Sequence, residues 1–155
     1  MKPRFRADSD GILADVPADE AELLEVIPQL LRELDPEDPA FARIHPAAYP
    51  ADPAADREFR RLVAGDADAA RREDQIAFLE SLGRATSGAV LSRSETDAWL
   101  RVLGEARLVL AVRLGIEIGD EEIPDPDTSL AGFYDYLSWL QGQLVEAAAD
   151  RLESA

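Results

Sequence analysis

The sequence predicts a mainly α-helical fold, a bundle of about five helices with a small β-hairpin at its N-terminus. Apolar residues recur at spacings of three and four over long stretches, which is typical of helices that bury one face. Residues 1–16 instead place apolar residues on both sides of a turn-forming segment, which indicates a hairpin. Apolar residues make up 46% of the 155 residues, enough to build a core. We therefore expect one helical domain over residues 1–155.

The hairpin is predicted from a turn signal over residues 8–11, with Phe5 on one side and Ile12 and Val16 on the other. A hairpin of this size is not stable alone, so we expect it to pack on the helices. The first helix begins near Pro17, which suits a first helical turn.

An apolar stripe continues the first helix to Leu34, and Pro28 should kink it. Residues 35–56 are rich in proline, so we expect a loop inside the domain and no helix there. The next helix is predicted over about residues 54–82, broken or bent near Gly65 and Asp66.

A connection over residues 84–93 leads to a helix over about 94–114, opened by a capping box of either Ser92 with Glu95 or Ser94 with Asp97. This helix is apolar nearly all round, so we expect it to be central and buried. An acidic, proline-bearing stretch follows, and the last helix runs from 128 or 129 to about 152 with the clearest apolar stripe in the chain.

The net charge of -16 is concentrated in two acidic flanks, residues 1–56 and 117–155, around a nearly neutral, arginine-rich middle. We expect no direct binding to nucleic acid or to anionic membranes, because phosphate contacts need an excess of Lys and Arg. No apolar stretch is long enough to span a membrane, and none follows the charged N-terminus, so we expect a cytoplasmic location. The chain has no cysteine, which excludes disulfides and thiol nucleophiles.

Three segments of the chain resemble a known family. They are His45-Pro46-Ala47-Ala48-Tyr49 with Asp52 and Glu58-Phe59, then AWLRVLGEARLVL at 98–110, and YDYLSWLQ at 134–141. Together they resemble an actinobacterial domain-of-unknown-function family whose genes typically lie beside the gene for the ClpS protease adaptor. Some members are described as transcriptional regulators. The resemblance implies no catalytic residue, and relatives that sense oxidants through cysteine pairs would differ from this chain.

Arg107 is the charge that most needs an explanation, because it lies in the middle of the most apolar helix. We predict that it pairs with Asp135 of the last helix, which is flanked by Tyr134 and Tyr136. Two interpretations stay open. The first, which we favour, is an internal ion pair that fixes the register of two helices. The second is an anion or ligand site in which Arg107, Asp135, Tyr134 and His45 come together.

His45 is the only histidine, and it lies in the proline-rich region. A side chain bonded to nearby backbone is the favoured interpretation, over a general base or a metal ligand. The acidic runs at 120–122 and 125–127 do not have the spacing of a calcium loop. With no phosphate-binding glycine loop or hydrolase motif, we expect no catalytic residues, no metal and no cofactor.

Two candidate interaction surfaces are predicted. The first is on the last helix, where some of Tyr136, Trp139 and Val145 should face a groove or a partner, with a second copy of the chain as one possibility. Arg57, Arg60 and Arg61 open an arginine-rich strip that would suit an acidic partner. Because acidic residues interleave with this strip, we favour a surface of local ion pairs over a binding site.

These observations favour a non-enzymatic, cytoplasmic regulatory or adaptor-like protein that acts through contacts with an unknown protein partner. One alternative is a transcription regulator, either on DNA or on the transcription machinery. Another is a ligand-binding or enzymatic protein that uses the polar cluster around Arg107, and a deep polar pocket there would favour it.

Overall fold

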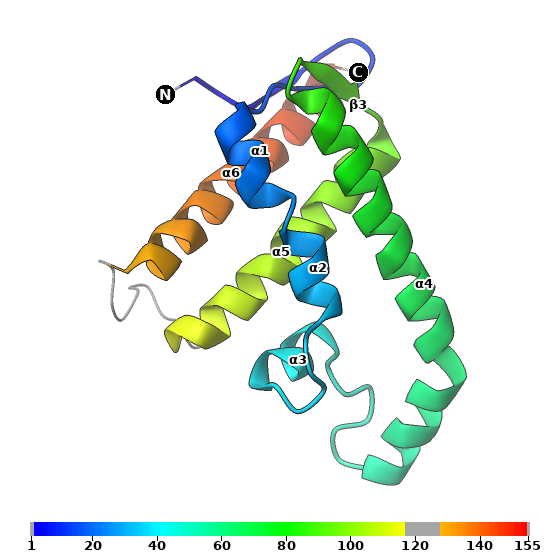
Figure 1. Cartoon of the computed structure of the whole chain (residues 1–155). Coiled ribbons are helices and arrows are strands. Elements are labelled where there is room, and N and C mark those ends of the chain that lie inside the picture. Colours follow the sequence, from blue (N-terminus) through cyan, green and yellow to red (C-terminus); the bar gives the residue numbers. More distant parts are fainter. Residues whose placement is uncertain (1, 117–127, 155) are drawn as a thin grey trace.

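The computed structural model describes residues 2–116 and 128–154, and it confirms a mainly α fold with a small sheet that holds the N-terminal hairpin (Figure 1). Helices α4, α5 and α6 form the body of the fold, with α5 between the other two. In the part of the chain described, no helix is long and apolar enough to cross a membrane. In chain order the elements are β1 (Phe5–Ala7), β2 (Ile12–Ala14), α1 (Ala18–Leu24), α2 (Ile27–Arg32), α3 (Pro39–Ile44), α4 (Pro53–Ala85), β3 (Ala89–Leu91), α5 (Arg93–Leu114) and α6 (Ser129–Ser154).

The predicted hairpin gains a third strand from the middle of the chain. Phe5 of β1 pairs with Ala14 of β2, and Ile12 of β2 pairs with Leu91 of β3, all antiparallel. The segment that contains β3 was expected to be only a connection. Three strands with an apolar face are stable where two are not. That face packs on α5, where the ring of Phe5 meets Trp99 edge-on with centroids 5.5 Å apart.

Two short helices replace the single kinked helix expected after Pro17. α1 ends at Leu24, and α2 begins at Ile27 with Pro28 in its first turn, where the missing N–H has no partner to lose. Leu24 and Ile27 are buried in the core. The proline therefore interrupts the helix as predicted, and the apolar stripe continues across the break.

The prediction that residues 35–56 form a loop throughout is wrong, because α3 lies inside this range. The Asp38 side chain caps α3 by accepting a hydrogen bond from the amide of Ala40 at 2.9 Å, and Pro39 takes the first turn. Asp52 repeats this arrangement at the start of α4. A proline directly after an aspartate thus starts a helix here instead of preventing one.

α4 is one continuous helix from Pro53 to Ala85, so of the two predicted alternatives near Gly65 and Asp66, a break and a bend, the break is wrong. A single glycine in an exposed helix interior costs only about 1 kcal/mol, too little to end a long helix. The buried residues of α4 all lie between Gln75 and Ala85. Its first half extends away from the core, with the 45–52 segment folded beside it (Figure 1).

α5 and α6 follow the prediction closely. The capping box that opens α5 is formed by Ser92 and Glu95, and Thr128 caps α6. Trp99 of α5 is completely buried, and its indole N–H donates a hydrogen bond to the hydroxyl oxygen of Ser81 in α4 at 2.7 Å. The polar group of the largest core residue is therefore satisfied inside the core.

Candidate functional site

Arg107 lies at the junction of α5 and α6, where three side chains of α6 hold its guanidinium. Its Nε donates a hydrogen bond to the hydroxyl oxygen of Ser138 at 2.9 Å, and its Nη1 donates to Oε1 of Gln141 at 2.6 Å. The guanidinium carbon lies 5.6 Å from the centre of the Tyr134 ring, within the range of a cation–π interaction. The three α6 residues are four and three positions apart, so they share one face of that helix.

The predicted ion pair between Arg107 and Asp135 is wrong. Asp135 is exposed, and the hydrogen bonds of Arg107 go to uncharged side chains. The reason is helical geometry, because Asp135 follows Tyr134 by one residue and is turned about 100° away from it. The residues missed are Ser138 and Gln141. Their spacing from Tyr134 is the signal that identifies them, since they lie one and two turns along the same face.

His45 follows α3 directly and ends it as its C-cap. Its ring stacks on that of Phe41 with centroids 4.1 Å apart. Burial lowers the pKa of His45, and the positive charge of nearby Arg71 lowers it further. The imidazole therefore packs on a ring, and the expected hydrogen bond from this side chain to nearby backbone is not present among the described residues.

The four residues proposed as one polar cluster separate in the structure. The ion pair between Glu105 of α5 and Arg71 of α4 shows which face of α5 lies toward α4. Arg107 follows Glu105 by two residues and therefore lies on nearly the opposite face, toward α6. His45 belongs to the α4 side of the molecule, since the charges that act on it come from α4. Only Arg107 and Tyr134 of the predicted cluster come together.

One continuous face runs along the boundary between α5 and α6, and we call it the α5–α6 seam. Three exposed apolar side chains accompany Arg107 there: Leu108 and Leu130 at 38% exposure and Val145 at 51%. Each lies one helical turn from a residue at the boundary. The seam consists of Leu100, Gly104, Arg107 and Leu108 on α5 and Leu130, Tyr134, Ser138, Gln141 and Val145 on α6.

α5 and α6 lie side by side along the seam at Gly104, where an added Cβ would make ordinary contact with Gln141. A Cβ at Gly104 would lie 3.4 Å from Nε2 of Gln141, at the lower edge of ordinary contact. The same Nε2 donates a hydrogen bond to the carbonyl oxygen of Leu100 at 3.2 Å. The amide of Gln141 therefore bridges two turns of α5.

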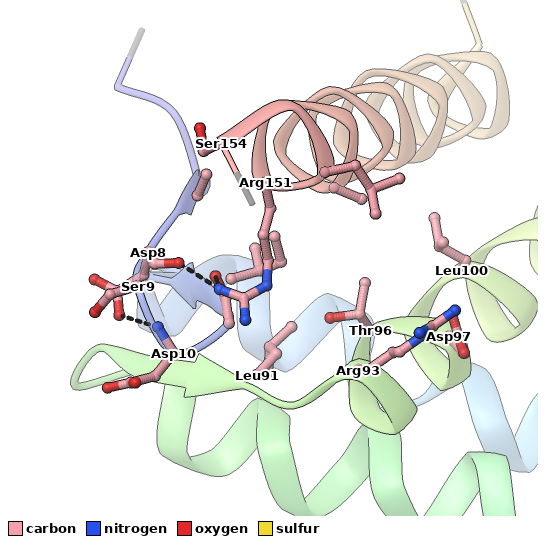
Figure 2. A pocket seen from close by; sticks show the side chains of 15 residues that line it. Asp8, Ser9, Asp10, Leu91, Arg93, Thr96, Asp97, Leu100, Arg151 and Ser154 are labelled. Carbon is pink, nitrogen blue, oxygen red and sulfur yellow. Dashed lines mark hydrogen bonds between the residues drawn. The ribbon is translucent and has the colours of Figure 1, made fainter.

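A hollow of about 880 Å³ lies at the end of the seam nearest the sheet (Figure 2). Leu100 lines both the seam and the hollow, so the two surfaces are continuous. Arg151 reaches from the last turns of α6 to the hairpin, where it donates to the carbonyl oxygens of Asp8 and Gly11. The charges of the hollow are mixed: Arg93 and Arg151 lie among Asp8, Asp10 and Asp97.

The most buried ion pair in the described chain lies between Arg4 and Glu20, and it was not predicted from the sequence. Arg4 donates from Nε and Nη2 to the two carboxylate oxygens of Glu20, at 3.0 and 2.6 Å. The Tyr136 hydroxyl donates to the same carboxylate at 2.7 Å, and the guanidinium lies 5.4 Å from the Trp139 ring. Hydrogen bonding from Arg4 lowers the pKa of Glu20, while burial raises the pKa of Tyr136. Tyr136 and Trp139 thus bind β1 and α1 to α6.

Val145 is the one member of the predicted α6 surface that is exposed; Tyr136 and Trp139 are half-buried against the core. On α4, Arg60 bonds Asp56 and the backbone carbonyl of His45, and Arg61 bonds Glu58. Local ion pairs therefore engage both arginines, as the favoured interpretation expects.

A family model covers residues 1–148 and gives its family the description domain of unknown function, DUF2017. The chain belongs to the DUF2017 family. No curated protein and no solved structure matches the chain.

Acidic residues are numerous in this DUF2017 chain, but within the described ranges no cluster of three or more His, Asp or Glu side chains is arranged to hold a metal ion. The acidic runs at 120–122 and 125–127 lie outside the described residues. Membership of the family agrees with the resemblance noted in the sequence, at the level of the family itself.

Proposed function

We propose that the protein is a non-enzymatic regulatory or adaptor-like protein that binds another protein through the α5–α6 seam. The observation that supports this proposal is the combination on one face of exposed Leu108, Leu130 and Val145 with an ordered Arg107 over Tyr134. Arginine and tyrosine dominate binding energy at protein interfaces, and apolar neighbours exclude water around them. The occupant we propose is an amphipathic helix of the partner lying along the boundary of the two helices.

Other exposed apolar side chains fit a binding face less well. Leu23, Val26 and Leu30 are exposed on α1 and α2, but they are divided by the break between those helices. Leu62 and Phe59 are exposed on the first half of α4, where the neighbouring Arg61 is already neutralised by Glu58. The seam instead lies on two long helices that pack on each other, which gives a partner a rigid surface.

The setting we propose is the cytoplasm, as expected from the sequence. The resemblance to an actinobacterial family encoded beside the ClpS adaptor supports a role in regulation, either in protein turnover or in transcription. For transcription we propose action through the transcription proteins and not on DNA. The net charge of -16 disfavours contact with phosphates.

A comparison of two charge insertions tests the proposal. Val145→Glu places a carboxylate in the seam, and Leu62→Glu places one on the exposed part of α4, at a position of similar exposure. Full-length protein of each kind is used as bait in extract of the native cell, and the captured proteins are quantified by mass spectrometry. We expect at least one protein that wild type and Leu62→Glu retain and Val145→Glu loses. Retention by all three baits, or loss with Leu62→Glu alone, would exclude the seam as the binding face.

Self-association is tested on the same variants. A second copy of the chain is the competing occupant, and sedimentation velocity over a wide concentration range distinguishes it. A dimer that Val145→Glu dissociates would contradict binding of a different protein at this face.

A further inference from the structure

We infer that Arg107 is the anchor for a carboxylate of the bound segment, so that the seam selects partners by an aspartate or glutamate set among apolar residues. This inference rests on the proposed function and names the chemistry of the partner. Three observations support it: the contacts that hold Arg107, the lack of a carboxylate partner for its charge among the described residues, and the exposed apolar side chains beside it.

The way Arg107 is held leaves part of its guanidinium available. Nε and Nη1 are committed to Ser138 and Gln141. Nη2 has no hydrogen-bond partner among the described residues, and the side chain is only half-buried. Guanidinium groups carry five N–H donors in a planar fork and bind carboxylates with parallel hydrogen bonds. The free edge is thus able to receive a carboxylate without breaking the contacts that hold Arg107.

The positive charge of Arg107 is not neutralised by any carboxylate in the part of the chain that the structure describes. Arg107 is held by side chains that are all uncharged, and in this it differs from seven arginines of the described ranges that bond a carboxylate. These arginines are Arg4, Arg60, Arg61, Arg71, Arg84, Arg101 and Arg113. A fixed arginine whose partners among the described residues are all neutral carries a positive charge that a carboxylate of a bound segment can neutralise.

Gln141 keeps this arrangement in one orientation. Its Nε2 donates to the carbonyl oxygen of Leu100, so its Oε1 must be the atom that faces Arg107. A glutamate at this position would neutralise the guanidinium, and glutamine positions it without doing so. The Tyr134 ring lies beside the guanidinium, with 5.6 Å between the guanidinium carbon and the ring centre. The anchor is therefore ordered before a partner arrives, which lowers the entropy lost on binding.

The surroundings define the rest of the partner's surface. Leu108 and Leu130 lie toward one end of the seam and Val145 toward the other, and all three are exposed beside the anchor. A matching helix would present apolar side chains at spacings of three and four with one acidic side chain between them. Apolar contact around the ion pair would exclude water and strengthen it.

Selection of peptides on the intact protein tests this inference. A display library of random peptides of about 16 residues is used, long enough for an amphipathic helix. Peptides that bind wild type are selected, and those that also bind Val145→Glu are removed. The peptides that remain are called seam ligands. Each ligand and its twin with Glu→Gln or Asp→Asn is then titrated against wild type, Arg107→Gln, Arg107→Lys and Arg101→Gln. Arg101 is the matched control, because it lies on the same helix but pairs with Asp74 of α4.

We expect every seam ligand to carry an acidic residue whose neutralisation weakens binding to wild type about tenfold, as for a close interfacial charge pair. The same twin should bind Arg107→Gln no more weakly than its parent does, and Arg107→Lys should keep part of the preference. Arg101→Gln should behave like wild type. Combining Arg107→Glu with a peptide Glu→Lys change should restore binding, which a purely structural role for Arg107 would not allow.

Two different failures are distinguishable. Seam ligands that lack an acidic residue, or that bind wild type and Arg107→Gln equally, would overturn the inference and leave the proposed function standing. If no peptide separates wild type from Val145→Glu, the seam is not a binding face and the proposed function fails. If Arg107→Gln does not fold, two measurements still test whether Arg107 binds a carboxylate. They are the titration of each peptide and its twin against wild type and the same titration against Arg107→Lys.

Discussion

Arg107 of α5 donates a hydrogen bond to Gln141 of α6, with 2.6 Å between Nη1 and Oε1, while Asp135 of the same helix is exposed. The two most apolar helices of the chain are therefore joined by a cation and neutral partners. This arrangement differs energetically from the buried ion pair that the sequence suggested, and the difference is measurable.

Loss of the Arg107 side-chain contacts should have a moderate effect on stability. Arg107→Gln removes the hydrogen bonds to Ser138 and Gln141 and the contact with Tyr134, which are worth about 1–3 kcal/mol together at a half-buried site. Asp135→Asn should change the free energy of unfolding by no more than about 0.5 kcal/mol, because the carboxylate is exposed. Urea unfolding followed by circular dichroism measures both. A decrease of several kcal/mol in the free energy of unfolding with Asp135→Asn would instead support an ion pair between Arg107 and Asp135.

The Arg4–Glu20 pair should behave as the buried ion pair of this fold. The two side chains are only 9% and 17% exposed. Arg4→Met or Glu20→Gln alone should lower the free energy of unfolding by about 3–5 kcal/mol, because the remaining charge stays buried without its partner. Changing both to methionine should cost clearly less than the sum of the single changes. Arg61→Met, at an exposed pair, is the control and should cost less than about 1 kcal/mol.

The pH dependence of stability should have opposite signs at Glu20 and Glu105. Hydrogen bonding from Arg4 lowers the pKa of Glu20, so its contribution is full above the unfolded pKa of about 4.3 and is lost as the pH falls through the lower folded pKa. Burial raises the pKa of Glu105, so ionisation of Glu105 weakens the fold as the pH rises from about 4.3 through the folded pKa.

Urea titrations from about pH 3 to about pH 7 check both signs, a range that brackets the usual pKa of glutamate. The free energy of unfolding of wild type minus that of Glu20→Gln should increase as the pH rises from the acid limit. The free energy of unfolding of wild type minus that of Glu105→Gln should decrease over the same range. Parallel trends for the two variants would show that the Arg4 hydrogen bond does not control the pKa of Glu20.

Two glycines provide a matched test of the sheet. A Cβ at Gly11 would overlap the carbonyl oxygen of Leu91 in β3, whereas a Cβ at Gly65 of α4 would meet open space. Gly11→Ala should therefore lower the free energy of unfolding by at least about 2 kcal/mol, because backbone has to move. Gly65→Ala should raise it by about 0.5–1 kcal/mol through the unfolded chain and helix propensity. A tolerated Gly11→Ala would argue against the pairing of β2 with β3.

The elements that the sequence predicted well are those decided by local pattern. The hairpin, the capping box at Ser92 and the start of α6 follow from turn residues, caps and periodic apolar residues. The strand β3 was not predictable in this way. Ala89–Leu91 is too short to show alternation and becomes a strand only because β2 lies beside it.

The candidate site shows the same limit. Sequence pattern identified Arg107 as a charge that needs partners and α6 as the helix that supplies them. Choosing Asp135 followed charge complementarity, but partners across two helices are decided by rotation about the helix axis, which placed neutral Ser138 and Gln141 there. The Arg4–Glu20 pair joins the residue directly before β1 to α1, and nothing in the local pattern marks such a contact.

The most direct test of the α5–α6 seam as the binding face is photocrosslinking in the native cell. A photoreactive phenylalanine analogue replaces Val145 in one strain and Leu62 in another, and crosslinked products are identified by mass spectrometry. We predict a crosslinked partner protein at Val145 whose yield falls when Arg107→Glu is added, and no specific partner at Leu62. A specific partner at Leu62 with none at Val145 would contradict the account.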